Sequence, residues 1–265
     1  MRTTQEPRLE ITPSSLTETF EQKYRRKGRL GSGPARRLRW GYFSPEEHYE
    51  TLVNQLVTGE TRWLDVGCGR AVFPSNPTLS KELSQRCTML VGVDPDQTIN
   101  ENPYLHKRVL GSVDDVVGDG PFSLVTMRMV AEHVAQPEAL LDTLARLTEE
   151  NGLVVVYTIY RYSPVPLITH ITPFSLHHPA KRILWRTQAK DTFPTAYRMN
   201  TRRELQSLFS AAGFTEKAFW HLDDCRTFQR WPLTSSIELA LWSALKRIGA
   251  GYPEKCLLGV YGRQP

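Results

Sequence analysis

Two closely spaced glycines follow a short run of residues with high β-propensity. The run Trp63–Val66 continues directly into Gly67-Cys68-Gly69. Glycine has no Cβ, so two glycines after a strand let the backbone turn sharply and approach a ligand closely. A second β-prone run ends at Asp94, 27 residues after Gly67, which is roughly the length of one strand–helix–strand unit. A carboxylate at that place can accept both hydroxyls of a ribose, so the pattern indicates a nucleotide-like ligand.

The residues around the glycines distinguish between two classes of ligand. Dinucleotide-binding turns use a third glycine, which allows close helix–strand packing around a pyrophosphate. Here Arg70, Ala71 and Val72 follow Gly69, and the third glycine is missing. Asp65, just before the turn, is a poor neighbour for a pyrophosphate, whereas its carboxylate attracts a cation. The turn therefore favours a ligand that carries both a ribose and a positive charge.

Four segments in the same order resemble the class I S-adenosylmethionine-dependent methyltransferases, whose ligand carries an ammonium and a sulfonium group. These segments are residues 63–70 (WLDVGCGR), 91–96 (VGVDPD), 122–134 and 149–155. The resemblance extends over about residues 60–158, with a return at 201–222, and is of the ubiquinone-pathway type that methylates small molecules. It implies an α/β fold: a three-layer α/β/α, Rossmann-like, seven-stranded and mostly parallel sheet with a reversed last hairpin and an inserted lid.

The resemblance also assigns roles in binding S-adenosylmethionine. Gly67 and Gly69 would approach its methionine part, and Asp65 would accept from its ammonium group directly or through water. Asp94 would bind the ribose hydroxyls. Cys68 lies between the two glycines in the cofactor site, where we interpret it as a packing residue rather than a nucleophile.

The residues expected around the adenine match the family less closely. Pro95, next to the ribose-binding acid, is included in the cofactor site. Relatives often have an acid after the third strand that accepts from the adenine amine, but the matching position here is Ser112. Either Ser112 accepts weakly or Asp114 takes its place, while Val113 would offer a backbone amide to the ring. Arg128, after the fourth strand, either faces the site or is a surface charge.

Methyl transfer is an in-line displacement at an activated methyl group, so the protein mainly aligns the reactants and excludes water. A base is needed only where the acceptor must lose a proton early. The catalytic candidates are His133, His170 and Tyr160. Glu132 and His133 resemble a pair that helps to bind a divalent metal in certain ubiquinone-pathway O-methyltransferases. Met129 stands where those relatives have a further acid, so we expect no metal and structural hydrogen bonds from the pair.

The elements that must position these residues alternate along the chain. Strands are expected at 62–66, 89–93, 108–110, 122–127, 152–157, 214–222 and 256–261. Helices are expected at 46–57, 79–85 and 137–147, after a capping box at 201–204, and after a second possible capping box formed by Ser235 and Glu238. That last helix carries Leu241, Trp242, Leu245 and Ile248. The alternation predicts a mostly parallel sheet with helices on both faces.

Charge is distributed unevenly along the chain. Residues 1–40 carry ten Lys/Arg and four Glu, whereas the remainder carries 23 basic and 24 acidic residues. We expect a basic N-terminal arm at 1–45 and a methyltransferase domain at 46–265, in which residues 159–200, rich in proline and apolar residues, form the acceptor lid. A basic arm can bind phosphate, nucleic acid or anionic lipid. The neutral remainder instead favours a solvated arm that packs near the site.

Composition excludes several classes of protein. With 265 residues, 40% hydrophobic and 23% charged, the chain has ordinary globular composition. Its longest nearly unbroken apolar run, Leu153 to Tyr160, falls far short of the ~20 residues of a membrane helix, and the first residues lack the apolar core of a secretory signal. Because the cysteines are widely spaced, we expect neither structural zinc nor a disulfide framework. We therefore expect a cytoplasmic location. The cysteines are Cys68, Cys87, Cys225 and Cys256.

Together these observations predict transfer of a methyl group to O, S or N of a small-molecule acceptor, by a monomer or homodimer. One alternative is a nucleic-acid (RNA) methyltransferase that uses the basic arm as a clamp. No Asn/Asp-Pro-Pro-Tyr run follows the fourth strand, so a nucleic-acid partner is not expected. The other alternative is a non-catalytic, methyltransferase-like binding subunit, which need not retain Asp65, Gly67, Gly69 and Asp94.

Overall fold

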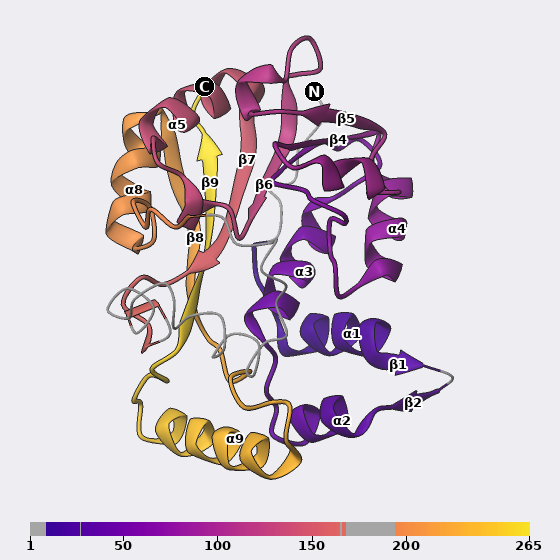
Figure 1. The fold of residues 1–265 in the computed structure, drawn as a ribbon, viewed down its shortest axis with the longest axis vertical. Helices are drawn as coiled ribbons and strands as arrows, with labels where there is room; N and C mark the ends of the chain where they lie inside the picture. The colour runs from indigo at the N-terminus through magenta and orange to yellow at the C-terminus, as the bar shows by residue number, and fades with distance from the viewer. Residues whose placement is uncertain (1–8, 27, 165, 168–193) are drawn as a thin grey trace.

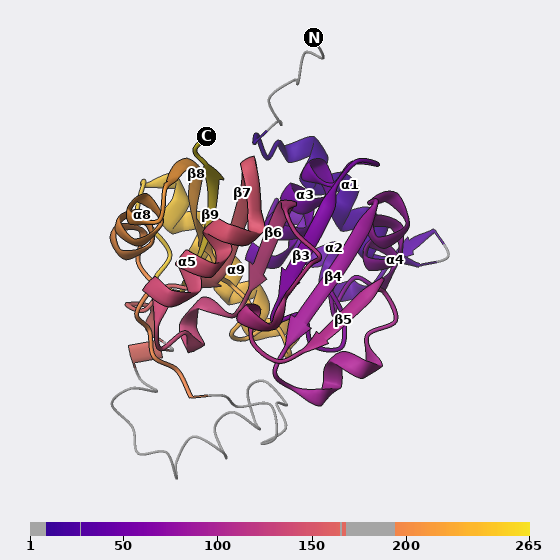
Figure 2. The same cartoon turned by 90° about the horizontal axis from the view of Figure 1, so that it is seen from above.

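Seven strands form one sheet in the order β5-β4-β3-β6-β7-β9-β8, and helices cover both of its faces (Figures 1 and 2). The computed structural model describes residues 9–26, 28–164, 166–167 and 194–265. The strands of the sheet are β3 (Arg62–Val66), β4 (Met89–Asp94), β5 (Lys107–Leu110), β6 (Phe122–Arg128), β7 (Thr148–Ile159), β8 (Phe214–Asp223) and β9 (Lys255–Arg263). The expected three-layer α/β/α arrangement with a seven-stranded, mostly parallel sheet is confirmed.

The sheet is parallel except at one strand. β3 pairs in parallel with β4 and β6, β4 with β5, and β6 with β7. β9 is antiparallel to both of its neighbours, β7 and β8, which is the reversed last hairpin. Residues 152–158 of β7 are all buried, as a central strand covered on both faces should be.

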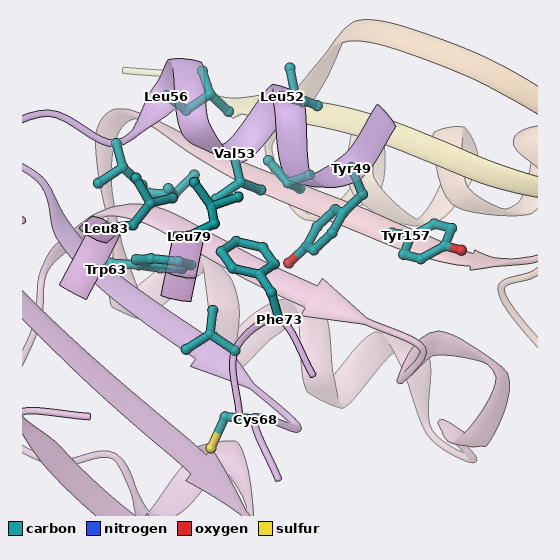
Figure 3. Close-up of a cluster of buried hydrophobic side chains, with 14 of the residues drawn as sticks. Tyr49, Leu52, Val53, Leu56, Trp63, Cys68, Phe73, Leu79, Leu83 and Tyr157 are labelled. Carbon is teal, nitrogen blue, oxygen red and sulfur yellow. The ribbon is translucent and has the colours of Figure 1, made fainter. Parts of the chain in front are cut away.

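On one face of the sheet lie α3 (Pro45–Leu56) and α4 (Pro77–Arg86), with α1 (Pro13–Tyr24) packed onto them. Figure 3 shows Val53 and Tyr49 of α3 on the side of the helix that faces Trp63. All three side chains are fully buried. This inward face explains the helical spacing of the apolar residues, while α1 packs on α3 from another side.

On the opposite face lie α5 (Pro137–Leu147) and α8 (Arg202–Ala211). Phe209 of α8 stacks on Tyr261 of β9, with 3.9 Å between the ring centroids. The Thr201 side chain caps α8 by accepting from the backbone N–H of Glu204 at 3.2 Å. The start of this helix was therefore readable from its cap.

Residues 13–39 fold into α1, a hairpin of β1 (Arg25–Arg26) and β2 (Arg29–Leu30), and α2 (Ser32–Arg39). Two basic side chains of this region are buried in ion pairs with α3. Lys23 Nζ lies 2.8 Å from Glu50 Oε1, and an Arg37 guanidinium nitrogen lies 3.0 Å from Glu47 Oε2. These pairs fix α1 and α2 to α3, so part of the positive charge counted in the sequence is not available to a partner. The domain boundary at residue 45 stays a prediction.

A last helix, α9 (Pro232–Arg247), connects β8 to β9 and lies beyond the sheet, beside α2 (Figure 1). The expectation that Ser235 and Glu238 open this helix is wrong. α9 begins at Pro232, whose ring fixes φ at the first helical position, and Ser235 and Glu238 are buried inside it. None of the helices in the described residues has the length and apolar character needed to cross a bilayer.

The apolar residues expected on this last helix are divided between two faces. Trp242 is buried and Leu245 packs beside it, in a cluster with Tyr42 of the N-terminal region. Leu241 and Ile248, in contrast, are 52% and 77% exposed. α9 is therefore held by one apolar face and presents a second to solvent.

Candidate functional site

The strand order reverses direction between β3 and β6, because β4 and β5 extend to one side and β7 to the other. In open parallel sheets, ligands bind in the crevice outside the carboxyl ends of the strands at such a switch point. The glycine turn after β3, Asp94 at the end of β4 and Arg128 at the end of β6 all lie on this edge. The topology thus brings together three of the sequence-predicted positions.

The glycine turn depends on the absence of side chains at Gly67 and Gly69. Gly67 has φ +69°, its N–H donates to the Val93 carbonyl at 2.8 Å, and a Cβ there would lie 2.3 Å from Val130 Cγ2. Gly69 has φ +45°, but a Cβ there would meet only an Asp94 carboxylate oxygen at 4.0 Å. Gly67 therefore permits close packing within the protein, whereas Gly69 borders open space in which a ligand can approach the backbone.

Asp94 is held in place by two backbone amides. Its Oδ2 accepts from Gly69 N–H and its Oδ1 from Asp96 N–H, each at 2.8 Å. A carboxylate offers about four acceptor positions, so further donors such as hydroxyl groups can be bound. Pro95, the next residue, is exposed beside it. The carboxylate of Asp94 is thus fixed against the same turn that Gly69 opens.

Asp65 is a buried carboxyl group at the end of β3. It is 2% exposed, and the Thr126 hydroxyl donates to its Oδ1 at 2.7 Å. Burial raises the pKa of Asp65 to about 7, and the negative charge of Asp94 adds to the effect, while the Thr126 hydrogen bond and Arg128 oppose it. A cation placed beside Asp65 would restore its ionised form.

Tyr49 and Arg128 complete the surroundings of Asp65. Arg128 lies with one guanidinium nitrogen 3.8 Å from Glu46 Oε1 and is about a quarter exposed, and its role in the site stays a prediction. Tyr49 Oη is fully buried beside the Thr126 hydroxyl, the group that donates to Asp65. Asp65 and Arg128 both act electrostatically on the Tyr49 hydroxyl.

Glu46 links this edge of the sheet to the N-terminal helices. It lies 3.4 Å from Lys23, 3.8 Å from Arg128 and 3.7 Å from Arg226. Burial alone would raise the pKa of Glu46, but these three cations lower it. Sequence reasoning missed this cluster, because its members come from four distant segments and form no local motif.

Cys68 packs inside the protein rather than facing a ligand. Its side chain is buried, and a Cβ on Gly92 of β4 would lie 2.6 Å from its sulfur. Burial also raises the pKa of the Cys68 thiol, which disfavours the nucleophilic thiolate. These observations support the interpretation of Cys68 as a packing residue.

Near the expected adenine position, the Ser112 hydroxyl is already engaged. It donates to Asp115 Oδ2 at 3.0 Å, and the same oxygen accepts the Ser112 N–H at 2.7 Å. The Asp114 carboxylate accepts a hydrogen bond from the Thr143 hydroxyl of α5. Its side chain is therefore directed to α5 and not to Ser112. The Val113 side chain is buried, which anchors this short segment. The acid nearest to Ser112 is Asp115, a residue that the sequence reasoning did not weigh.

The Glu132–His133 pair makes structural contacts. The Thr158 hydroxyl donates to Glu132 Oε2 at 2.7 Å, and His133 Nδ1 lies 2.9 Å from the Pro194 carbonyl oxygen. Burial raises the pKa of Glu132. In the part of the chain that the structure describes, no group of three or more His, Cys, Asp or Glu side chains is arranged to hold a metal ion.

Tyr160, another catalytic candidate, does not join this pair. Tyr160 packs edge-on against Tyr162 and His221, with centroid distances of 5.5 and 5.8 Å. It lines a cavity of about 900 Å³ with Tyr197 and Arg198. The Asp65 and Asp94 side chains do not line that cavity. His170 lies outside the described residues.

Comparison with known proteins identifies the family to which this chain belongs. The chain belongs to the methyltransferase domain family, whose sequence model matches residues 22–216. The resemblance to class I S-adenosylmethionine-dependent methyltransferases is thereby confirmed, and the family implies S-adenosylmethionine as the methyl donor.

Among individual relatives, a ubiquinone biosynthesis O-methyltransferase of Bradyrhizobium diazoefficiens is 31% identical over 135 residues, which cover 47% of this chain and 51% of the relative. One from Rhizobium johnstonii is 32% identical over 109 residues, covering 38% and 42%. The chain thus matches about half the length of these relatives or less. An S-adenosylmethionine-dependent methyltransferase of Mesorhizobium loti shares the fold, with a TM-score of 0.54 at 16% identity over 83% of this chain and 98% of that one.

Proposed function

We propose that this protein transfers the methyl group of S-adenosylmethionine to a heteroatom of a small-molecule acceptor. The observation that carries the proposal is the pair of carboxyl groups, Asp65 and Asp94, at the carboxyl ends of the neighbouring strands β3 and β4. Asp94 is held by Gly69 N–H at 2.8 Å, and buried Asp65 lies behind the same turn. Two acids repel a phosphate but suit a ligand with ribose hydroxyls and an ammonium group.

The residues at this edge fit S-adenosylmethionine in charge and in space. Gly69 borders open space, and burial raises the pKa of Asp65 to about 7. When bound, the sulfonium supplies an already activated methyl group. Asp94 would orient the ribose, and Asp65 would become ionised as it accepts from the ammonium group. The protein then contributes alignment and exclusion of water rather than covalent chemistry.

His133 is the described residue best placed to act as a base among the three candidates. Its Nδ1 faces the Pro194 carbonyl oxygen at 2.9 Å, so Nδ1 carries the proton and donates. In the neutral imidazole Nε2 then carries the lone pair, which is the tautomer that a general base needs. His133 also follows the end of β6 on the same edge as Arg128. We therefore assign proton removal from the acceptor to His133, ahead of Tyr160 and His170.

The relatives suggest which acceptor atom to test first. Those that match at 31% and 32% identity are O-methyltransferases of ubiquinone biosynthesis, so we propose a hydroxyl oxygen as the acceptor. An oxygen acceptor with a proton to lose also gives His133 a role. Residues 159–200 remain our proposal for the segment that covers the acceptor; residues 165 and 168–193 of it lie outside the described part of the chain.

The test is release of S-adenosylhomocysteine by the full chain with a panel of phenols, thiols and amines. We expect turnover with a phenol, and His133→Gln should lower kcat by about 10²-fold or more while leaving cofactor affinity unchanged. Cofactor binding without turnover on the whole panel would favour the non-catalytic alternative. Turnover that is unchanged in His133→Gln would show that proton removal does not depend on His133.

A further inference from the structure

α9 presents an apolar stripe to solvent. Leu233, Ile237 and Leu241 recur every four residues and are 74%, 60% and 52% exposed. Side chains at this spacing lie one above the other on one face of a helix. Ile248, directly after the helix, is 77% exposed. In surface helices of globular proteins such a stripe normally packs on the core, so its exposure here requires an explanation.

Among the described residues, large exposed apolar side chains are most concentrated in and around α9. Phe228 and Trp231, just before α9, are also 43% and 41% exposed. Other large exposed apolar side chains, such as Val117 at 77%, stand apart in the sequence. Scattered exposed residues need no explanation, whereas a contiguous patch indicates an interaction surface.

The charges around the stripe are positive. Glu238 is the one acidic residue of α9, and it is 4% exposed with its carboxylate accepting from the Tyr252 hydroxyl at 3.0 Å. Arg247 is exposed at the C-terminal end of the helix, whereas Lys246 lies over the ring of Trp242, on the inward side. α2 lies alongside (Figure 1) and ends at the exposed Arg39, in a segment, residues 25–39, that contains no Asp or Glu.

We propose that this surface, formed by the α9 stripe and the basic residues around it, docks on an anionic phospholipid bilayer. An amphipathic helix with Leu, Ile and Trp on its apolar face and basic residues at the edge lies in the plane of a bilayer interface. Basic residues near an anionic leaflet are attracted to it.

The position of α9 in the fold gives this docking a consequence. β8 runs in the same direction as β7, because both are antiparallel to β9. α9 follows the end of β8 and therefore lies off the carboxyl edge of the sheet, where the candidate cofactor site is (Figure 1). Docking through α9 would bring that edge of the molecule towards the lipid.

The test is co-sedimentation of the full chain with vesicles of phosphatidylcholine alone and of phosphatidylcholine mixed with phosphatidylglycerol. We expect binding to the anionic vesicles, weaker binding to the neutral ones, and loss of the difference at high salt. The triple variant Leu233→Ser, Ile237→Ser, Leu241→Ser should lower the partition coefficient by at least about tenfold. Arg39→Gln and Arg247→Gln should each lower it by about fivefold on anionic vesicles only.

Val117→Ser is the matched control, because it removes an equally exposed apolar side chain elsewhere. It should bind vesicles as the wild type does. All the substituted side chains are exposed, so circular dichroism should show unchanged folding. No binding by the wild type, or equal binding by the triple variant, would overturn the proposal. A dimer in analytical ultracentrifugation that the triple variant abolishes, without vesicle binding, would identify a second copy as the partner instead.

Discussion

The Thr126 hydroxyl on β6 donates to Asp65 Oδ1 on β3 at 2.7 Å, and the two residues face each other in the parallel strand register. The same hydroxyl accepts from Trp63 Nε1 at 2.7 Å. All three groups are buried. Thr126 therefore connects the apolar core under α3 to the carboxyl group proposed to receive the ammonium group of the cofactor.

We expect Thr126→Val to lower both stability and cofactor affinity. The substitution keeps the shape of the side chain but leaves the Trp63 N–H and an Asp65 oxygen without this partner, which costs about 1–3 kcal/mol for a buried group. Thr126→Ser retains the hydroxyl and is the control. Urea unfolding and calorimetric titration measure the two effects. A Thr126→Val protein equal to the wild type in both would contradict the role assigned to this hydroxyl.

Binding of S-adenosylmethionine should strengthen as pH rises through 7. The raised pKa of Asp65, about 7 because of burial, means that the ionised form needed by an ammonium group becomes scarce below that pH. Affinity at pH 6 should be about tenfold lower than at pH 8. Calorimetric titration across this range measures the change. A pH-independent affinity in the wild type would exclude Asp65 as the titrating partner.

Asp65→Asn is the control for this pH dependence, and it should bind weakly at every pH. The pKa of Asp65 is higher in the folded state than its usual value of 3.8, so the carboxyl group lowers stability as pH rises from about 4 to 7. Removing the charge should therefore raise the free energy of unfolding at pH 7, by at most about 4 kcal/mol. Urea unfolding of the two proteins gives this difference.

Gly67→Ala should be far more damaging than Gly118→Ala. Both glycines have positive φ, +69° and +78°, but a Cβ at Gly67 would lie 2.3 Å from Val130 whereas one at Gly118 meets nothing within 4 Å. Gly118→Ala should cost about 1–2 kcal/mol for the left-handed backbone, and Gly67→Ala about 1–3 kcal/mol more for the clash. Thermal and urea unfolding compare them. Equal losses would show that the turn is not packed as described.

Lys23→Met should destabilise the protein strongly. The buried ammonium of Lys23 lies within 4 Å of Glu46, Glu47 and Glu50, and its removal leaves these carboxyl groups without their shared cation. Breaking a buried ion pair costs about 3–5 kcal/mol. Arg25→Met, which removes an exposed pair with Glu21, should cost less than about 1 kcal/mol. A similar, small loss in both variants would mean that the N-terminal helices do not depend on these ion pairs.

The residues of the candidate cofactor site could be predicted from the sequence because each belongs to a short local motif. Gly67, Gly69 and Asp94 sit at the ends of strands that the sequence marks by composition, and the parallel topology places strand ends together. The contact between Thr126 and Asp65 joins residues 61 positions apart. It depends on the strand register, which no local pattern specifies. The Glu46 cluster was missed for the same reason.

Tyr160 and α9 show a second limit of prediction from sequence, namely the direction in which a side chain points. Tyr160 follows a strand at the expected edge, but its ring packs on Tyr162 and His221, and only the tertiary structure determines that direction. The spacing of the apolar residues on α9 predicted a helix, but it did not predict which of them face the core. Trp242 and Leu245 face inward because Tyr42, from the N-terminal region, packs there.

Calorimetric titration of S-adenosylmethionine and S-adenosylhomocysteine into the wild type and Asp94→Ala tests the central claim most directly. Asp94 fixes the Gly69 turn and is the proposed ribose acceptor, so the wild type should bind both ligands and Asp94→Ala should lose at least about tenfold in affinity. Asp142→Ala, which removes an exposed acid on α5, should bind normally. Failure of the wild type to bind either ligand, or equal binding by Asp94→Ala, would contradict the assignment of this edge as the cofactor site.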